Sequence, residues 1–138
     1  MYLIDTHVIS ELHKGDRAHT GVVRFLRTTD ADSLFLPVQT LGELRKGVET
    51  IRLRRDLDQA HRLEQWLDLV VQSYGDRILD FDHECAQMWG RLMAQGPQHP
   101  IDRQIAATAL LYDFTVVTQN TPNFDGTGVR LLNPFVDH

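Results

Sequence analysis

Three acidic residues of this sequence lie beside apolar stretches that are expected to face a protein core. They are Asp5, Glu43 and Asp102. Each has an ordinary structural explanation when it is taken alone. Asp5 can cap a helix, Asp102 can favour a helix N-terminus, and Glu43 can pair with a neighbouring basic side chain on a helix surface. Taken together, they are typical of an enzyme that gathers carboxylates at the carboxyl ends of parallel strands.

Carboxylates that converge in this way repel one another, which raises their pKa values and destabilises the fold. A divalent cation removes the repulsion, and Mg²⁺ binds through one or two carboxylates together with water and substrate phosphate. Such an ion activates water and stabilises displacement at a phosphodiester. The sequence does not contain the residue patterns that other chemistries require. The seven histidines show no metal-ligand spacing, Cys85 has no partner cysteine, and there is no Gly-rich phosphate loop. The acids therefore predict metal-assisted phosphodiester hydrolysis.

The elements that must position these acids alternate between strand and helix. Strands are predicted at residues 1–4, 33–36, 78–81, 115–118 and 129–132. A single long helix is expected over residues 51–71, and Gly47 is expected to loosen or end the helix before it. Asp82 is expected to cap a helix that runs to Ala94. Strands separated by helices of this length predict an α/β fold with a mostly parallel central sheet covered on both faces.

Composition limits the class of protein. A chain of 138 residues that is 42% hydrophobic fits one domain with its own core. It has no apolar run near the ~20 residues of a membrane span and no signal-peptide pattern, so a cytoplasmic protein is expected. The single Cys85 excludes an internal disulfide framework and is expected in the core. The net charge of −5 does not indicate a nucleic-acid binder, although acids of a metal site contribute charge that cations neutralise.

Basic residues recur between positions 52 and 62, at Arg52, Arg54, Arg55 and Arg62. Two interpretations are open. Either these arginines form a phosphate-contacting surface, or they belong to the solvated face of a helix, which is the commoner case.

Five segments in this order along the chain resemble the PIN-domain ribonuclease toxins of the VapC/FitB-like group of type II toxin–antitoxin systems. They are YLIDTHVISE (2–11), LGELRKG (41–47), IDRQIAATA (101–109), VTQN (117–120) and FDGTGVRLLNP (124–134). The resemblance implies a single PIN-like domain over residues 1–138, folded as a three-layer α/β/α sandwich. It also implies a cytoplasmic endoribonuclease that uses Mg²⁺ or Mn²⁺, is usually dimeric, and is silenced by a cognate antitoxin.

The same resemblance assigns roles to particular residues. By position, Asp5 and Asp102 match the principal metal ligands, and Glu43 matches the third catalytic acid. Thr6 and Thr118 match small hydroxyl residues at two strand ends, where they are expected to position the substrate.

One part of the pattern differs from the family. A fourth acid is common in the loop after the strand at residues 115–118, but here the two usual slots hold Asn120 and Asn123. Asp125 follows Phe124 and is the remaining candidate for a fourth acid. We expect Asn120 to lie nearer the chemistry, since its amide oxygen can bind a metal without adding charge.

Two further hypotheses compete with an RNA-cleaving toxin. One is a catalytically weak PIN-like module that binds RNA or an antitoxin without efficient cleavage. The intact Asp5, Glu43 and Asp102 favour the ribonuclease, whereas Asn120 and Asn123 keep the weak module open as an alternative. The other is a receiver-type phosphoacceptor domain, but His7 and Gln119 stand where paired acids and a lysine would be needed.

The large apolar residues that could form a dimer contact or an antitoxin groove are Phe25, Leu26, Trp66 and Trp89.

Overall fold

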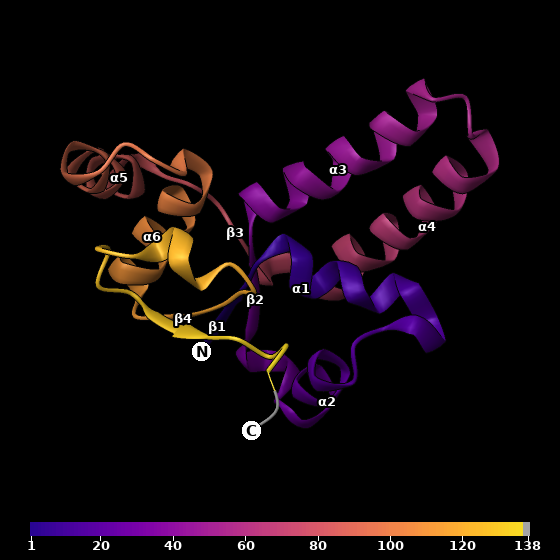
Figure 1. Cartoon of the computed structure of the whole chain (residues 1–138), viewed down its shortest axis with the longest axis horizontal. Helices are drawn as coiled ribbons and strands as arrows, with labels where there is room; N and C mark the ends of the chain where they lie inside the picture. The colour runs from indigo at the N-terminus through magenta and orange to yellow at the C-terminus, as the bar shows by residue number, and fades with distance from the viewer. Residues whose placement is uncertain (137–138) are drawn as a thin grey trace.

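A five-stranded parallel sheet forms the centre of the protein (Figure 1), and the computed structural model describes residues 1–136. The strand order is β3-β2-β1-β4-β5, and every neighbouring pair is parallel. The strands are β1 (Tyr2–Ile4), β2 (Leu34–Pro37), β3 (Ile78–Leu79), β4 (Thr115–Val117) and β5 (Arg130–Leu132). All five lie within the predicted strand segments or within one residue of them, so the predicted α/β fold with a mostly parallel sheet is confirmed.

Helices cover both faces of this sheet and make three layers. On one side lie α1 (Thr6–Ser10), α2 (Thr20–Thr28), α3 (Val38–Leu53) and α4 (Leu57–Tyr74), and on the other α5 (His83–Gln95) and α6 (Pro100–Tyr112). Short 3₁₀ helices connect them: η1 (Glu11–Arg17), η2 (Ala31–Ser33), η3 (Gly75–Arg77) and η4 (Thr121–Phe124). Among residues 1–136, no helix has both the length and the apolar content needed to cross a bilayer.

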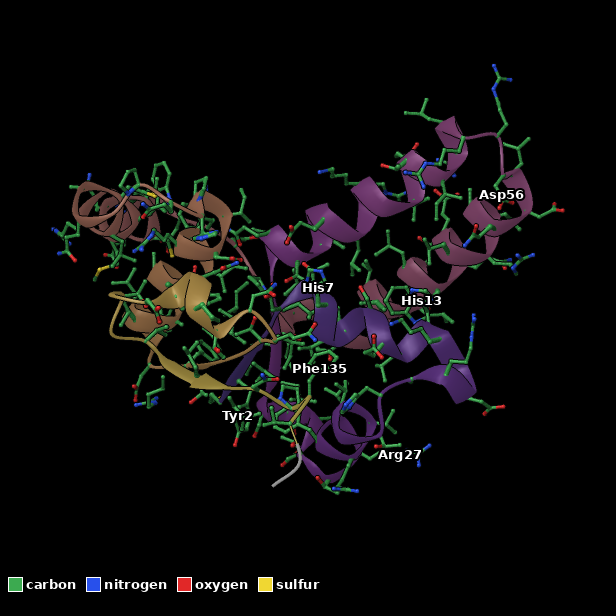
Figure 2. All side chains as sticks on the ribbon, viewed as in Figure 1. Tyr2, His7, His13, Arg27, Asp56 and Phe135 are labelled. Carbon is green, nitrogen blue, oxygen red and sulfur yellow. The ribbon has the colours of Figure 1, made fainter. Side chains whose placement is uncertain are left out.

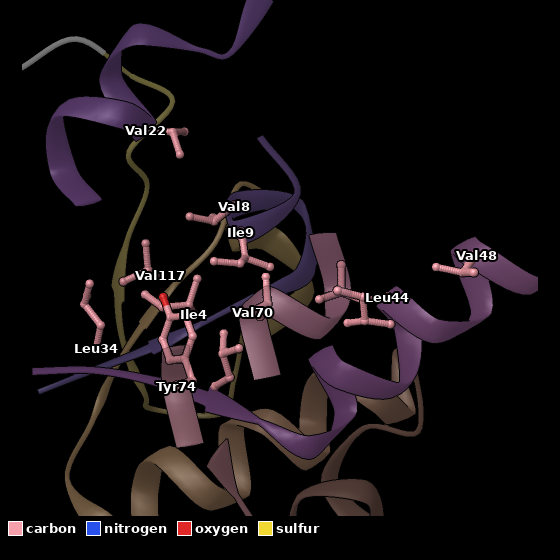
Figure 3. Packing of buried hydrophobic residues seen from close by; sticks show 12 residues of the cluster. Ile4, Val8, Ile9, Val22, Leu34, Leu44, Val48, Val70, Tyr74 and Val117 are labelled. Carbon is pink, nitrogen blue, oxygen red and sulfur yellow. The ribbon is translucent and has the colours of Figure 1, made fainter. Parts of the chain in front are cut away.

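The core consists of two apolar clusters, one on each face of the sheet. Successive strand residues point to opposite faces, so Ile4 and Val117 belong to the first cluster, while Leu3 and Val116 belong to the second. Figure 3 shows the first cluster, where side chains of α1, α3 and α4 pack against the strands. Cys85 is fully buried, as expected of a core residue.

The predicted single helix over residues 51–71 is wrong, because the chain turns back between α3 and α4. Gly47 does not interrupt α3, which continues to Leu53. Arg55 then adopts a positive φ of 67°, and the side chain of Asp56 caps α4 by accepting a hydrogen bond from the Gln59 amide. The two helices form an antiparallel hairpin that projects from the sheet (Figure 1).

Ion pairs across this hairpin involve one of the arginines singled out in the sequence, Arg52. Arg45 and Arg52 both bind Glu64 of α4, and Arg52 also pairs with Glu49. Arg52 therefore serves the α3–α4 contact rather than a free basic surface. Arg54, Arg55 and Arg62 remain exposed.

The helix prediction at residues 82–94 is confirmed, since Asp82 caps α5 through the Cys85 amide.

Candidate active site

Asp5 stands where β1 ends and α1 begins, at the carboxyl edge of the sheet. It is only 3% exposed, and its amide donates to the Val117 carbonyl of β4. Oδ1 accepts from the Thr6 amide at 2.8 Å, which makes Asp5 the N-cap of α1. Oδ2 accepts from the Thr118 hydroxyl at 2.7 Å. The capping role expected from sequence is therefore present, but it uses only one of the two carboxylate oxygens.

Thr118 connects Asp5 to the loop that follows β4. The hydroxyl that donates to Asp5 also accepts a hydrogen bond from the Asn120 amide at 3.0 Å. Thr118 is fully buried and Asn120 is half-buried. The loop backbone at Asn120 is thus fixed within two hydrogen bonds of the Asp5 carboxylate.

Glu43 reaches the same edge from α3. One turn earlier, the buried Thr40 hydroxyl donates to the Ile4 carbonyl at 3.0 Å, which ties α3 to the end of β1. Residues three apart share a helix face, so Glu43 lies on the side of α3 that Thr40 anchors. The Thr6 hydroxyl donates to Glu43 Oε1 at 2.7 Å. Thr6 therefore contacts Asp5 through its amide and Glu43 through its hydroxyl.

Asp102 lies in the first turn of α6 and is half-buried. Its Oδ2 accepts a hydrogen bond from the Asn123 side-chain amide at 2.9 Å. Sequence reasoning noted Asn123 only as one of two substituted slots and did not assign it a contact. The signal available was its position directly before Phe124, whose buried ring fixes the loop against the second core cluster.

The Asp125 side chain is exposed, and Asp125 contacts its neighbours through its backbone. Its carbonyl accepts from Arg103 Nη2 at 3.2 Å, while Arg103 Nε donates to the Gln98 carbonyl at 2.9 Å. Arg103 is buried and so joins the loops on either side of Asp102. A second bridge runs from Gln39 of α3 to Gln104 of α6, at 3.1 Å. These contacts fix the spacing between the helices that carry Glu43 and Asp102.

The electrostatics of this edge are dominated by uncompensated negative charge. Burial raises the pKa of Asp5 above its usual value, the hydrogen bonds from Thr118 and Thr6 lower it, and the charges of Asp102 and Glu43 raise it further. Within residues 1–136, none of these three acids takes part in a salt bridge. A buried carboxylate without a cationic partner is costly, so this donor set suits an added cation.

The kind of cation follows from the spacing of the acids. In the described part of the chain, no three histidine, cysteine or acidic side chains lie close enough together to hold a metal by themselves. These residues therefore do not form a site for a soft metal whose ligands all come from the protein. A hard ion that keeps most of its waters and uses one or two carboxylates fits Asp5 and Asp102.

A pocket of about 240 Å³ opens beside this edge between α1 and the α3–α4 hairpin. Thr6, Glu43 and His7 line one end, and Trp66, Leu67 and Val48 are among the apolar residues of the remaining wall. Of the residues around the carboxylate site, the pocket is lined by Thr6 and Glu43 and not by Asp5 or Asp102.

The chain is similar to known proteins over almost its whole length. A family model described as PIN domain matches residues 2–127. VapC ribonuclease Y4jK from Sinorhizobium fredii is 34% identical, with 98% of each chain covered. Toxin FitB from Neisseria gonorrhoeae is 32% identical, covering 99% of this chain and 100% of that protein.

Solved structures give the same result for the fold. The crystal structure of FitAcB from Neisseria gonorrhoeae superposes with a TM-score of 0.81 at 30% identity, covering 98% of this chain and 99% of that one. Other solved structures with this fold come from toxin–antitoxin systems. Relatives named as ribonuclease and toxin do not favour a catalytically weak binding module.

Proposed function

Because the chain belongs to the PIN domain family, which its residues 2–127 match, we propose that it is the toxin of a toxin–antitoxin pair and a Mg²⁺-dependent endoribonuclease. PIN nucleases in general use divalent metal ions. The relatives named VapC ribonuclease and toxin FitB support the substrate class and the toxin role, since each matches this chain over almost its whole length.

One observation carries the proposal most directly. Asp5 lies at the carboxyl edge of a parallel sheet, where burial raises its pKa and the charges of two further acids add to the rise. No basic side chain of residues 1–136 forms an ion pair with any of the three. A fold stabilised for its own sake would not keep such a group uncompensated. Burial at this cost is typical of a functional site.

Asp5 and Asp102 would hold the cation. A divalent ion bound there supplies an activated water and stabilises charge on the phosphodiester during in-line displacement. The protein supplies orientation: Thr118 and the Thr6 amide hold the Asp5 carboxylate, and Asn123 holds Asp102. Mn²⁺ accepts the same oxygen ligands.

Glu43 differs from the other two acids because it is exposed. The Thr6 hydroxyl holds its Oε1 toward the site, where the carboxylate can accept a proton from an attacking water. Thr6 and Thr118 thus act as positioning residues for the acids, and they remain candidates for substrate positioning. Asn120 lies at the edge of the site through its amide contact with Thr118.

A toxin of this kind needs a protein that silences it, so we propose a cognate antitoxin as partner. We also propose a homodimer, a cytoplasmic location where RNA is available, and a single domain over residues 1–138. The domain proposal is supported by the sheet, because the first core cluster includes Val117 from β4 and the second includes Leu3 from β1.

Cleavage of a mixed RNA substrate in Mg²⁺ and in EDTA tests the activity. We expect Asp5→Asn and Asp102→Asn to reduce cleavage by on the order of 100-fold or more, because several kcal/mol of charge stabilisation depend on the ion. The same changes should raise the melting temperature in EDTA by about 2–5 °C, since they relieve repulsion. Asp80→Asn, at an exposed acid, is the matched control. Cleavage that persists undiminished in EDTA contradicts the proposal.

A further inference from the structure

A second pocket, of about 470 Å³, lies between η1 and α4 and is lined by basic side chains. They are His13, Lys14 and Arg17 from η1 and Arg62 from α4, and no acid among residues 1–136 lines the pocket. This concentration is unusual in a chain whose net charge is −5. A local basic surface on an acidic protein indicates an anionic ligand.

The backbone conformation of η1 places His13, Lys14 and Arg17 on the wall of this pocket. Gly15 interrupts the helix with φ 61° and ψ −124°, a conformation that favours glycine, and Lys14 and Arg17 flank it closely. Lys14 pairs with the buried Glu11, which fixes the start of η1. In the described part of the chain, Arg17 and Arg62 form no salt bridge, so both guanidinium groups remain available.

An aromatic side chain completes the pocket. Trp66 is half-buried against the first core cluster and also lines the pocket wall. His13 packs against its ring edge-on, with centroids 5.1 Å apart. A ring held in this way can stack with a planar base at little conformational cost, and arginines beside it suit phosphates.

This basic pocket adjoins the first pocket, which Thr6 and Glu43 line. The two share His13, Leu63 and Trp66 in their walls, and the other end of the first pocket is lined by Thr6 and Glu43. Figure 2 shows His7 and His13 along the same side of α1 and η1, facing the α3–α4 hairpin. Trp66 therefore lines both the pocket that contains Glu43 and the pocket that contains the two arginines.

We propose that the basic pocket is a subsite for single-stranded RNA, in which Arg17 and Arg62 bind backbone phosphates and Trp66 stacks with a base flanking the cleaved bond. Alternation of cationic and aromatic groups is the usual way of holding a single strand. The inference rests on the proposed ribonuclease function, since it extends the path of the substrate away from the acids. An acidic polypeptide is the competing occupant, but it gives no role to a stacking platform.

Binding can be measured without cleavage by fluorescence anisotropy of a labelled single-stranded RNA of mixed sequence in EDTA. The double variant Arg17→Gln/Arg62→Gln should bind about tenfold more weakly. The slope of log Kd against log salt should fall by about 1.4, since each single-strand phosphate contact contributes about 0.7. The control Arg54→Gln/Arg55→Gln removes the same charge at the tip of the hairpin, in the turn between Leu53 of α3 and Leu57 of α4. Equal losses in both variants would overturn the subsite.

Stacking has its own readout because the chain has two tryptophans. In Trp89→Phe protein, RNA should quench the emission of Trp66, whereas in Trp66→Phe protein it should leave Trp89 unchanged. Trp89 donates to the Pro100 carbonyl on the other side of the sheet, so it serves as the internal reference. Quenching of Trp89 alone contradicts the proposal.

Failure of the subsite is distinguishable from failure of the proposed function. If wild-type protein cleaves RNA and the Arg17/Arg62 variant cleaves with unchanged KM and binds RNA equally well, only the subsite is wrong, and a polypeptide remains as the occupant. If wild-type protein neither binds nor cleaves RNA in Mg²⁺, the ribonuclease function is wrong as well.

Discussion

The carboxylate site depends on side chains that hold its acids in place. Thr118 donates a hydrogen bond to Asp5 and Asn123 donates one to Asp102, while Thr6 donates to both Asp5 and Glu43. Asn123 occupies one of the slots where a fourth acid is common in the family, and here it donates to Asp102 instead of adding charge. The substitution therefore reduces repulsion in the metal-free protein while it keeps Asp102 oriented.

The other substituted slot leads to a prediction about metal affinity. Asn120→Asp adds a carboxylate within reach of Thr118 and is expected to tighten Mg²⁺ binding several-fold, because ligand charge raises the affinity of a hard cation. Isothermal titration calorimetry measures the change. An unchanged or weaker affinity would mean that the side chain at position 120 does not face the metal.

Asp125→Asn is the companion variant. The exposed Asp125 side chain should have a smaller effect on cleavage than Asp5→Asn, because only the Asp125 carbonyl is engaged with Arg103. A loss as severe as that of Asp5→Asn would show that Asp125 has taken the role of fourth acid.

At the scale of elements, Glu11 joins η1 to the start of α2. Its carboxylate is buried, binds Lys14, and accepts from the His19 amide at 2.9 Å. Burial raises the pKa of Glu11, but these two hydrogen bonds outweigh it and leave the pKa below the usual 4.5. Because η1 also carries Arg17, this carboxylate helps to position the basic pocket.

The lowered pKa of Glu11 predicts a pH-dependent stability. A group whose folded pKa is depressed stabilises the protein above its unfolded pKa, and the contribution is lost as the pH falls through the folded value. Glu11→Gln should lower the free energy of unfolding at neutral pH by about 1 kcal/mol. The difference from wild type should shrink below the ordinary pKa of 4.5.

Urea denaturation at neutral and acidic pH checks this expectation. Glu84→Gln, at an exposed position of α5, is the control for loss of one charge. A destabilisation by Glu11→Gln that is independent of pH would assign its role to packing alone.

At the scale of the whole molecule, the large apolar residues expected in a dimer contact or an antitoxin groove are partly buried against the core. Phe25, Leu26 and Trp66 pack against the first cluster and Trp89 packs against the second. The apolar side chains that remain exposed include Leu53 and Leu57 at the hairpin tip and Leu69 on α4.

We still expect a homodimer, because the family resemblance implies one. Light scattering at tens of micromolar should give about twice the 15.8 kDa mass of one chain. A mass of one chain across that range would contradict the dimer.

The sequence alone determined the elements and the identity of the acids. Strand runs, the cap at Asp82 and the position of Asp5 after β1 are set by neighbours along the chain, so local signals suffice. Sequence reasoning failed at residues 51–71, because a continuous helical pattern conceals the turn at Arg55. The pattern is continuous because both flanking helices bury a similar apolar face.

Only the tertiary structure decided which groups meet. Thr118 and Asp5 are 113 positions apart, Thr6 and Glu43 are 37 apart, and Asn123 and Asp102 are 21 apart. The strand order and the packing of α3 and α6 on the sheet set these contacts, and no local pattern encodes them. The same holds for the basic pocket, since Arg17 and Arg62 lie on elements that are brought together only by the fold.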